Sequence, residues 1–172
     1  MPAAFRTTRV VEFADTDMAG IIHFAAFFRY MEAAEHEFLR SRGLSVAWRD
    51  AASDPVGFPR VSASCDYRTP ARFQDVLDIA VTPARVGRKS VTYEFEFTRQ
   101  GEPIARGQIT AVCCRTTPDH GCPMAPGRRR YQRYRVHMRA DARNTGVRSP
   151  GWRRATTASW AGGRYRTWWV FT

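Results

Sequence analysis

One long amphipathic segment constrains the fold more than any other feature of this sequence. Between residues 21 and 42, apolar side chains recur at the three- and four-residue spacing that places them on one face of an α-helix. They are Phe24, Phe27, Phe28, Met31, Ala34, Phe38 and Leu39. Gly43 follows at a position where helices commonly end. We therefore predict one helix whose phenylalanine-rich face is buried against another element.

Strand-like segments flank this helix on both sides. A segment rich in Thr and Val precedes it at 5–13, and alternating polar and apolar residues follow at 61–68, 76–85, 91–98 and 104–115. Short turns between the later segments favour antiparallel neighbours. The order predicts an α+β domain in which an antiparallel sheet wraps one central helix. Because so small a sheet leaves an unpaired edge, we also expect subunits to associate.

The net charge of +11 belongs to the C-terminal part of the chain. Residues 121–172 hold 12 of the 27 basic and one of the 16 acidic side chains, so the remainder carries 15 of each. We therefore divide the chain into a domain at 1–117 and an Arg- and Trp-rich tail at 118–172. Three interpretations of the tail stay open: an irregular or disordered segment, a segment that binds nucleic acid or another acidic partner, and the product of a shifted reading frame.

The composition also limits the class of protein. No apolar run reaches the ~18 residues of a membrane span, and the first residues lack the apolar core of a secretory signal. We therefore expect a cytoplasmic protein. None of the four cysteines forms a C-x-x-C pair. We expect neither a metal site nor a disulfide framework, and assign the cysteines as small apolar residues in a reducing compartment.

The stretch ADTDMAGIIHF, residues 14–24, places two carboxylates, a glycine and a histidine ahead of the helix. Unpaired backbone N–H groups and the helix dipole make a helix start positive, so it can polarise a bound carbonyl oxygen. Gly20 would leave room for a substrate there. Asp17 could act as nucleophile or general base, and His23 could position water, hold the ligand or tune the carboxylate. Spacing alone also allows Asp15 and Asp17 to be helix caps and His23 to be structural.

The stretch DTDMAGIIHFAAFFRYMEAAEHEFLRSRGL resembles the signature segment of the hotdog-fold acyl-CoA thioesterases, the family of 4-hydroxybenzoyl-CoA thioesterase and its relatives. The similarity continues through SASCDYRTPARFQDVLDI and VGRKSVTYEFEFTRQGEPIARGQITAVCC, and covers residues 5–117. The resemblance implies a hotdog fold and hydrolysis of a thioester to a carboxylate and a thiol, without metal or redox cofactor. It also implies a homodimer or homotetramer with the acyl pocket at a subunit interface.

Carried over residue by residue, the family's catalytic carboxylate falls on Asp17. The backbone N–H that polarises the carbonyl falls at the helix start, near His23 and Phe24, with Gly20 beside it. Asp15 matches the first aspartate of the motif, and we expect it to support the loop. Many relatives carry an aromatic residue followed by histidine where this sequence has His23 and then Phe24, so His23 is the second candidate for a catalytic residue.

The resemblance also suggests residues that bind the substrate. Arg88 and Lys89 lie in a tight turn where similar enzymes offer basic residues to the nucleotide phosphates of coenzyme A. Phe27 and Phe58 would line the acyl pocket, although core packing explains them equally well. Two other functions stay open: nucleic-acid binding through the tail, and a hotdog domain that binds acyl-CoA or an acyl carrier protein without turnover.

Overall fold

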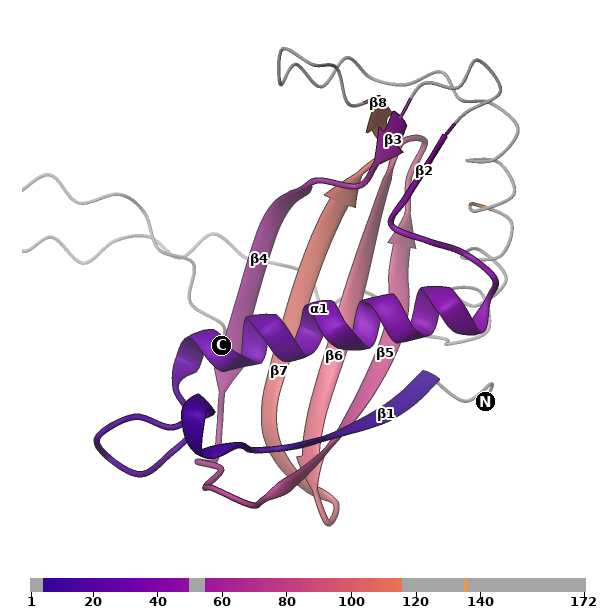
Figure 1. Cartoon of the computed structure of the whole chain (residues 1–172). Helices are drawn as coiled ribbons and strands as arrows, with labels where there is room; N and C mark the ends of the chain where they lie inside the picture. Colours follow the sequence, from indigo (N-terminus) through magenta and orange to yellow (C-terminus); the bar gives the residue numbers. More distant parts are fainter. Residues whose placement is uncertain (1–4, 50–54, 116–134, 136–172) are drawn as a thin grey trace, which may run out of the picture.

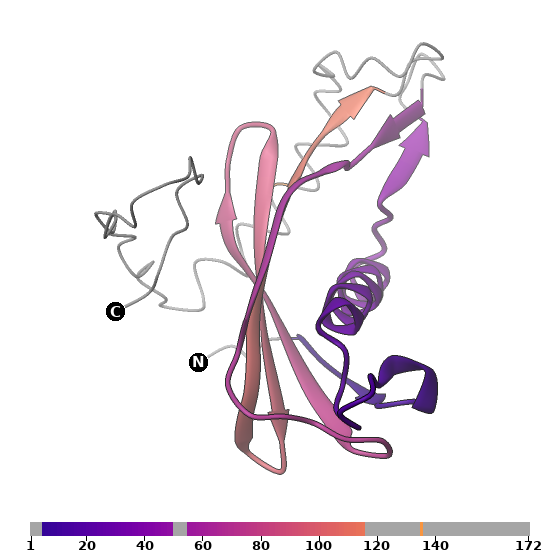
Figure 2. The ribbon, with the colours of Figure 1, turned by 90° about the vertical axis from the view of Figure 1, so that its left-hand side faces the viewer.

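The computed structural model describes residues 5–49, 55–115 and Arg135. One helix, α1 (Phe24–Ser41), lies across one face of a five-stranded antiparallel sheet (Figure 1), and the view from the side shows the two layers (Figure 2). The strands are β1 (Phe5–Val10), β4 (Arg60–Tyr67), β5 (Val76–Val86), β6 (Ser90–Arg99) and β7 (Glu102–Val112), in the order β1-β5-β6-β7-β4. The predicted arrangement of one helix wrapped by an antiparallel sheet is confirmed.

The strand order differs from a simple chain of hairpins. The strands β4 and β5 follow one another in sequence, but β4 pairs with β7 and β5 pairs with β1. The connection at 68–75 packs beside the loop that precedes α1. Ile22 N–H donates to the Ala71 carbonyl at 2.8 Å, and Gln74 N–H donates to the Val11 carbonyl at 2.9 Å. Because these bonds hold the connection at the end of the sheet, it does not close a hairpin between β4 and β5.

The helix begins three residues later than its apolar pattern predicts. Ile21 and Ile22 are extended and form isolated bridges with Arg72 and Thr16. These pairings keep the two isoleucines out of the helix, and His23 becomes the N-cap residue.

Short helices and strands lie in regions for which the sequence pattern predicts either no regular structure or one longer strand. A one-turn 3-10 helix, η1 (Phe13–Asp15), ends the first strand segment early. Between α1 and β4, where the sequence shows no strand pattern, β2 (Ala47–Arg49) and β3 (Pro55–Gly57) form a second, small sheet with β8 (Cys114–Arg115). The strand predicted at 104–115 is therefore two strands in two sheets.

The core lies between α1 and the sheet. Alternate residues of β6 face the helix and are buried, namely Val91, Tyr93, Phe95 and Phe97. Phe27 and Phe38 of α1 pack against these rings, with centroid distances of 5.2 Å from Phe27 to Phe97 and 6.1 Å from Phe38 to Tyr93. Phe24, which the pattern assigned to this buried face, lies at the helix start and is 60% exposed.

The cysteines differ in their bonding. Cys65 and Cys113 are free thiols, whereas Cys114 is disulfide-bonded. The expectation that the cysteines are simply reduced apolar residues is therefore wrong for Cys114. No C-x-x-C spacing marks this bond, so the sequence pattern offered no signal for it.

Gly107 leaves room in the sheet for the Met31 side chain of the helix. It lies in β7 opposite Phe95, and a Cβ added there would meet Met31 Sδ at 2.1 Å and Ser64 O at 3.4 Å. Since Met31 is fully buried, its side chain has little room to move. We expect Gly107→Ala to lower the free energy of unfolding by about 1–3 kcal/mol, as measured by urea denaturation.

The matched control for Gly107→Ala is Gln108→Ala, at a half-buried position on the opposite face of the same strand. This variant should stay within about 0.5 kcal/mol of the wild type. Equal stability of Gly107→Ala and the wild type would show that the helix does not press on this glycine.

Candidate active site

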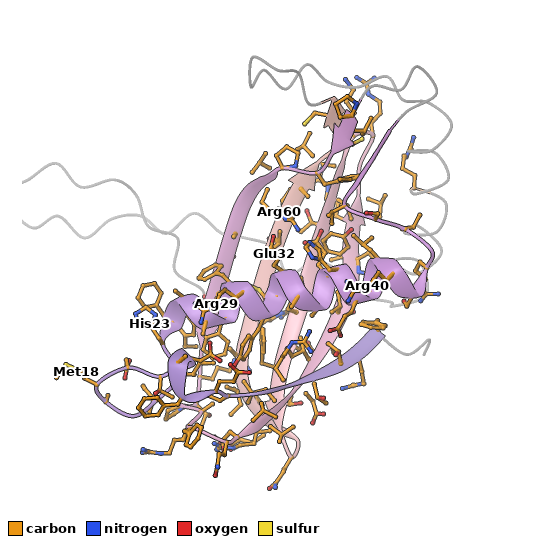
Figure 3. All side chains as sticks on the ribbon, in the orientation of Figure 1. Met18, His23, Arg29, Glu32, Arg40 and Arg60 are labelled. Carbon is orange, nitrogen blue, oxygen red and sulfur yellow. The ribbon has the colours of Figure 1, made fainter. Side chains whose placement is uncertain are left out.

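The residues between η1 and α1 form a short loop, 16–22, that projects from the helix start. A backbone bridge closes its base. Within it, Asp17 N–H donates to the Ile21 carbonyl at 2.9 Å, and Gly20 N–H donates to the Asp17 carbonyl at 2.9 Å. Figure 3 shows Met18 at the tip of the loop, pointing away from the helix. The loop therefore has a defined backbone although most of its side chains are exposed.

Gly20 is required by its backbone conformation. Its φ is +70°, a value that residues with a side chain rarely adopt. A Cβ at this position would meet only Arg72 Nη1, at 4.0 Å, so space does not explain the glycine. Gly20 closes the turn of the loop four residues before α1 begins. The positive φ is thus one reason for the glycine, and the expected room for a substrate beside the helix N–H groups stays a prediction.

Neither aspartate of the motif caps α1. The N-cap residue is His23, whose Nδ1 accepts a hydrogen bond from the Ala25 N–H at 3.2 Å. Asp17 is exposed, and its Oδ1 accepts a hydrogen bond from the Ala19 N–H at 2.8 Å. The structure thus gives His23 a structural role at the helix start and leaves the Asp17 carboxylate facing solvent within its own loop.

Asp15 anchors the loop to the helix, as its position in the motif led us to expect. Its buried carboxylate accepts hydrogen bonds from Tyr30 Oη and Arg29 Nη2, both at 2.5 Å, and from the Glu12 N–H at 3.2 Å. Its carbonyl accepts from the His23 N–H at 2.7 Å. One residue therefore ties η1, the N-cap and the body of α1 together.

The pKa values of this anchor reflect these contacts. Burial raises the pKa of Asp15, but the hydrogen bonds from Tyr30 and Arg29 outweigh it, and the net shift is downward. Burial and the hydrogen bond to Asp15 raise the pKa of Tyr30 beyond its ordinary value of 10. Asp15 is therefore ionised at neutral pH and Tyr30 remains its neutral donor.

The helix start offers a free backbone donor. The His23 N–H binds the Asp15 carbonyl, and the Ala25 N–H binds His23. Among the hydrogen bonds between described residues, none uses the Phe24 N–H. Tyr67 Oη donates to the Phe24 carbonyl at 3.3 Å, which fixes the first helical residue against β4. Of the two backbone N–H groups near which the sequence analysis places an oxyanion donor, only that of Phe24 is unpaired among the described residues, and its role stays a prediction.

The predicted substrate-binding residues do not gather around this loop. Arg88 and Lys89 lie between β5 and β6, at the far end of β5 from the loop. Eleven strand residues separate the two ends of β5, about 35 Å. Phe27 and Phe58 are 3% exposed and belong to the core. Core packing accounts for both phenylalanines, and the single chain does not bring the two basic residues to Asp17.

An ionic cluster around one buried glutamate, between α1 and β4, was not anticipated from the sequence. Glu35 is completely buried, and Arg60 Nη2 donates to its Oε2 at 3.0 Å. Glu32 and His36 lie at 3.5 Å and 3.1 Å from the same nitrogen, and Figure 3 shows Arg60 and Glu32 facing each other. Burial raises the pKa of Glu35, and Arg60 partly opposes this. Glu35 occupies a helix position where the apolar periodicity predicts an apolar side chain. This mismatch is the only signal in the sequence that points to the cluster.

Two further expectations concern the C-terminal tail and the possibility of a membrane span. The tail at 118–172 lies outside the described residues, apart from Arg135, so nucleic-acid binding through it stays a prediction. Across 5–49 and 55–115, no helix has the length and apolar character that crossing a membrane requires.

The fold and this site define the class of protein. One long helix across an antiparallel sheet, preceded by an aspartate-bearing loop at the helix start, is a hotdog fold. Solved hotdog structures of thioesterases superpose on most of this chain. The chain belongs to the Thioesterase-like superfamily, whose sequence profile matches residues 11–141. This match extends into the segment that we assigned to the tail.

Several relatives carry specific names. A 1,4-dihydroxy-2-naphthoyl-CoA hydrolase from Prochlorococcus marinus (strain MIT 9313) is 30% identical over 125 residues, covering 69% of this chain and 83% of the relative. A 1,4-dihydroxy-2-naphthoyl-CoA thioesterase from Synechocystis is 25% identical, with a TM-score of 0.64 over 78% of this chain and 96% of its own. A gentisyl-coenzyme A thioesterase is 29% identical, with a TM-score of 0.60 over 72% and 95%.

Proposed function

We propose that the protein hydrolyses an acyl-CoA thioester to a carboxylate and free coenzyme A, and that Asp17 is the catalytic carboxylate. The observation that carries this proposal is the position of Asp17 in a braced loop next to a helix start with a free N–H. Membership of the thioesterase family supplies the reaction type. We also propose a cytoplasmic location, where acyl-CoA is available and where the reducing conditions would keep Cys114 as a thiol.

In the proposed reaction the thioester carbonyl oxygen accepts a hydrogen bond from the Phe24 N–H. The helix dipole adds positive potential at the same point. Asp17 either removes a proton from the water that attacks the carbonyl carbon, or attacks this carbon itself to form a mixed anhydride that water then hydrolyses, which releases the carboxylate product and restores Asp17. A carbon–oxygen bond forms, the carbon–sulfur bond breaks, and the thiolate leaves with the electron pair. His23 shapes the helix start by capping it.

We further propose that the acyl group is a hydroxylated aromatic ring. The support is that the named relatives act on 1,4-dihydroxy-2-naphthoyl-CoA and gentisyl-coenzyme A. The test compares kcat/KM for these two esters with those for acetyl-CoA and decanoyl-CoA. We expect the aromatic esters to be preferred. A higher kcat/KM for either aliphatic ester would contradict this assignment.

We propose that two chains associate through β4. This strand is the last in its sheet, with β7 on one side only, so its other edge is unpaired among the described strands. Val61 and Tyr67 on it are 61% and 49% exposed, and Phe24 beside Tyr67 is 60% exposed. An exposed apolar edge strand favours pairing with another copy. Such a dimer would also bring a second chain to the candidate site.

This arrangement predicts the effect of a charge on the edge. Val61→Lys should shift the protein from dimer to monomer in sedimentation velocity, because a lysine on an edge strand opposes strand pairing. Val76→Lys changes an equally large valine, 51% exposed, on the interior strand β5 and should leave the dimer intact. A wild-type protein that sediments as a monomer would refute the proposed association.

A further inference from the structure

We propose that Arg72 binds a phosphate group of the thiol carrier, so that the connection at 68–72 is the phosphate-recognition segment of the site. This inference rests on the proposed function, because it concerns the non-reacting part of the same substrate. The chemistry it names is the phosphate attached to pantetheine, which coenzyme A and acyl carrier proteins share.

Backbone pairing fixes Arg72 next to the loop that carries Asp17. Inside the loop the Asp17 N–H binds the Ile21 carbonyl, and Ile21 in turn forms a backbone bridge with Arg72. Because paired backbones lie about 5 Å apart, these two pairings place the Arg72 backbone about 10 Å from that of Asp17. The Arg72 guanidinium lies alongside Gly20, where the missing side chain leaves the loop surface open. The pantetheine arm, with its two amide groups, is long enough to cover this separation.

Arg72 also stands apart from the other arginines near the loop. Arg29 pairs with Asp15, and Arg99 pairs with both Asp75 and Glu102. Arg72 is exposed and makes no ion pair with any described residue. Its charge helps to lower the pKa of the nearby Asp75.

The Asp75 carboxylate is already occupied. Its Oδ2 accepts hydrogen bonds from Arg99 Nη1 at 2.6 Å and from the Arg72 backbone N–H at 2.7 Å. These bonds lock the backbone of the connection and leave the Arg72 guanidinium free for another anion. A guanidinium is well suited to this because it donates two parallel hydrogen bonds to phosphate.

A second cation lies on the same segment. Arg68 is exposed, makes no ion pair within the described residues, and directly follows Tyr67, which is bonded to the helix start. Arg68 and Arg72 therefore flank the candidate site on its own chain, whereas Arg88 and Lys89 lie at the other end of β5. Two cations four residues apart favour a ligand with more than one negative charge, as coenzyme A has.

The test measures binding by isothermal titration calorimetry, with three free thiols: coenzyme A, 4′-phosphopantetheine and pantetheine. It uses the full chain as wild type, Arg72→Ala and the control Arg85→Ala, which removes an exposed arginine near the far end of β5. We expect Arg72→Ala to raise the Kd of coenzyme A about tenfold and to leave that of pantetheine unchanged. Arg85→Ala should bind coenzyme A like the wild type.

The remaining outcomes separate the possibilities. Equal losses for 4′-phosphopantetheine and coenzyme A would support the inference, because both contain the phosphate attached to pantetheine. A loss for coenzyme A alone would place Arg72 at a nucleotide phosphate and overturn the inference. An unchanged Kd for coenzyme A, a similar loss for pantetheine, or no binding of coenzyme A to the wild type would overturn the inference. Because no turnover is needed, a wild type that binds coenzyme A through Arg72 but hydrolyses no ester would refute the proposed function only.

Discussion

Replacing Asp17 by asparagine is expected to lower kcat by about 10²–10⁴-fold while the protein stays folded. The amide removes the negative charge that a nucleophile or general base needs. The fold should be unchanged, because Asp17 is exposed and, among the described residues, its side chain makes one hydrogen bond, which it accepts from the Ala19 N–H. The Oδ1 of asparagine can accept the same bond. Thermal unfolding monitored by circular dichroism should therefore give the same Tm for both proteins.

The control for this variant is Glu96→Gln, which changes an exposed carboxylate on the interior strand β6. It should retain the wild-type kcat. Full activity in Asp17→Asn, or an equal loss in both variants, would remove Asp17 from the chemistry.

The second large effect concerns stability. Asp15→Asn should lower the free energy of unfolding at pH 7 by about 2–4 kcal/mol, because three donors converge on one buried carboxylate. An amide cannot accept all three hydrogen bonds and places its own N–H₂ against a donor. The loop should loosen with it, because the carboxylate bonds to Tyr30 and Arg29 hold the residues before the loop against α1. Urea denaturation of both proteins measures the difference.

The same pair of proteins gives a defined pH dependence. The pKa of Asp15 lies below its ordinary value of 3.8. A carboxyl with a lowered folded pKa contributes stability that is fully present above the unfolded pKa and is lost as the pH falls through the folded pKa. The stability difference between wild type and Asp15→Asn should be constant from about pH 5 to 8 and shrink below pH 4. A difference that grows on acidification would contradict the assignment of Asp15 as an ionised anchor.

Much of the fold could be predicted because its signals are local. Helical spacing located α1, and strict alternation located β6, where Val91, Tyr93, Phe95 and Phe97 all face the core. Both patterns arise from elements with one buried face, and such elements must repeat apolar residues at their own period. The role of Asp15 could also be predicted, because the motif places this residue directly before the loop that it anchors to α1.

The features that escaped prediction depend on distant contacts. The place of β4 beside β7 follows from how 68–75 binds the loop before α1, which no local pattern encodes. The burial of Glu35 depends on Arg60, which follows 25 residues later in the sequence and donates a hydrogen bond to it from β4. Arg72 approaches the loop only through the bridge to Ile21. Sequence reasoning therefore found the carboxylate loop but not the cations around it.

The most direct test of the central claim is thiol release by the purified full-length chain from 1,4-dihydroxy-2-naphthoyl-CoA and gentisyl-CoA. Mass spectrometry would identify both products. The account predicts saturable release of coenzyme A with an equal amount of the free aromatic acid, at a rate that is proportional to enzyme concentration. Release no faster than the uncatalysed background from these esters and from the aliphatic acyl-CoA esters would contradict it.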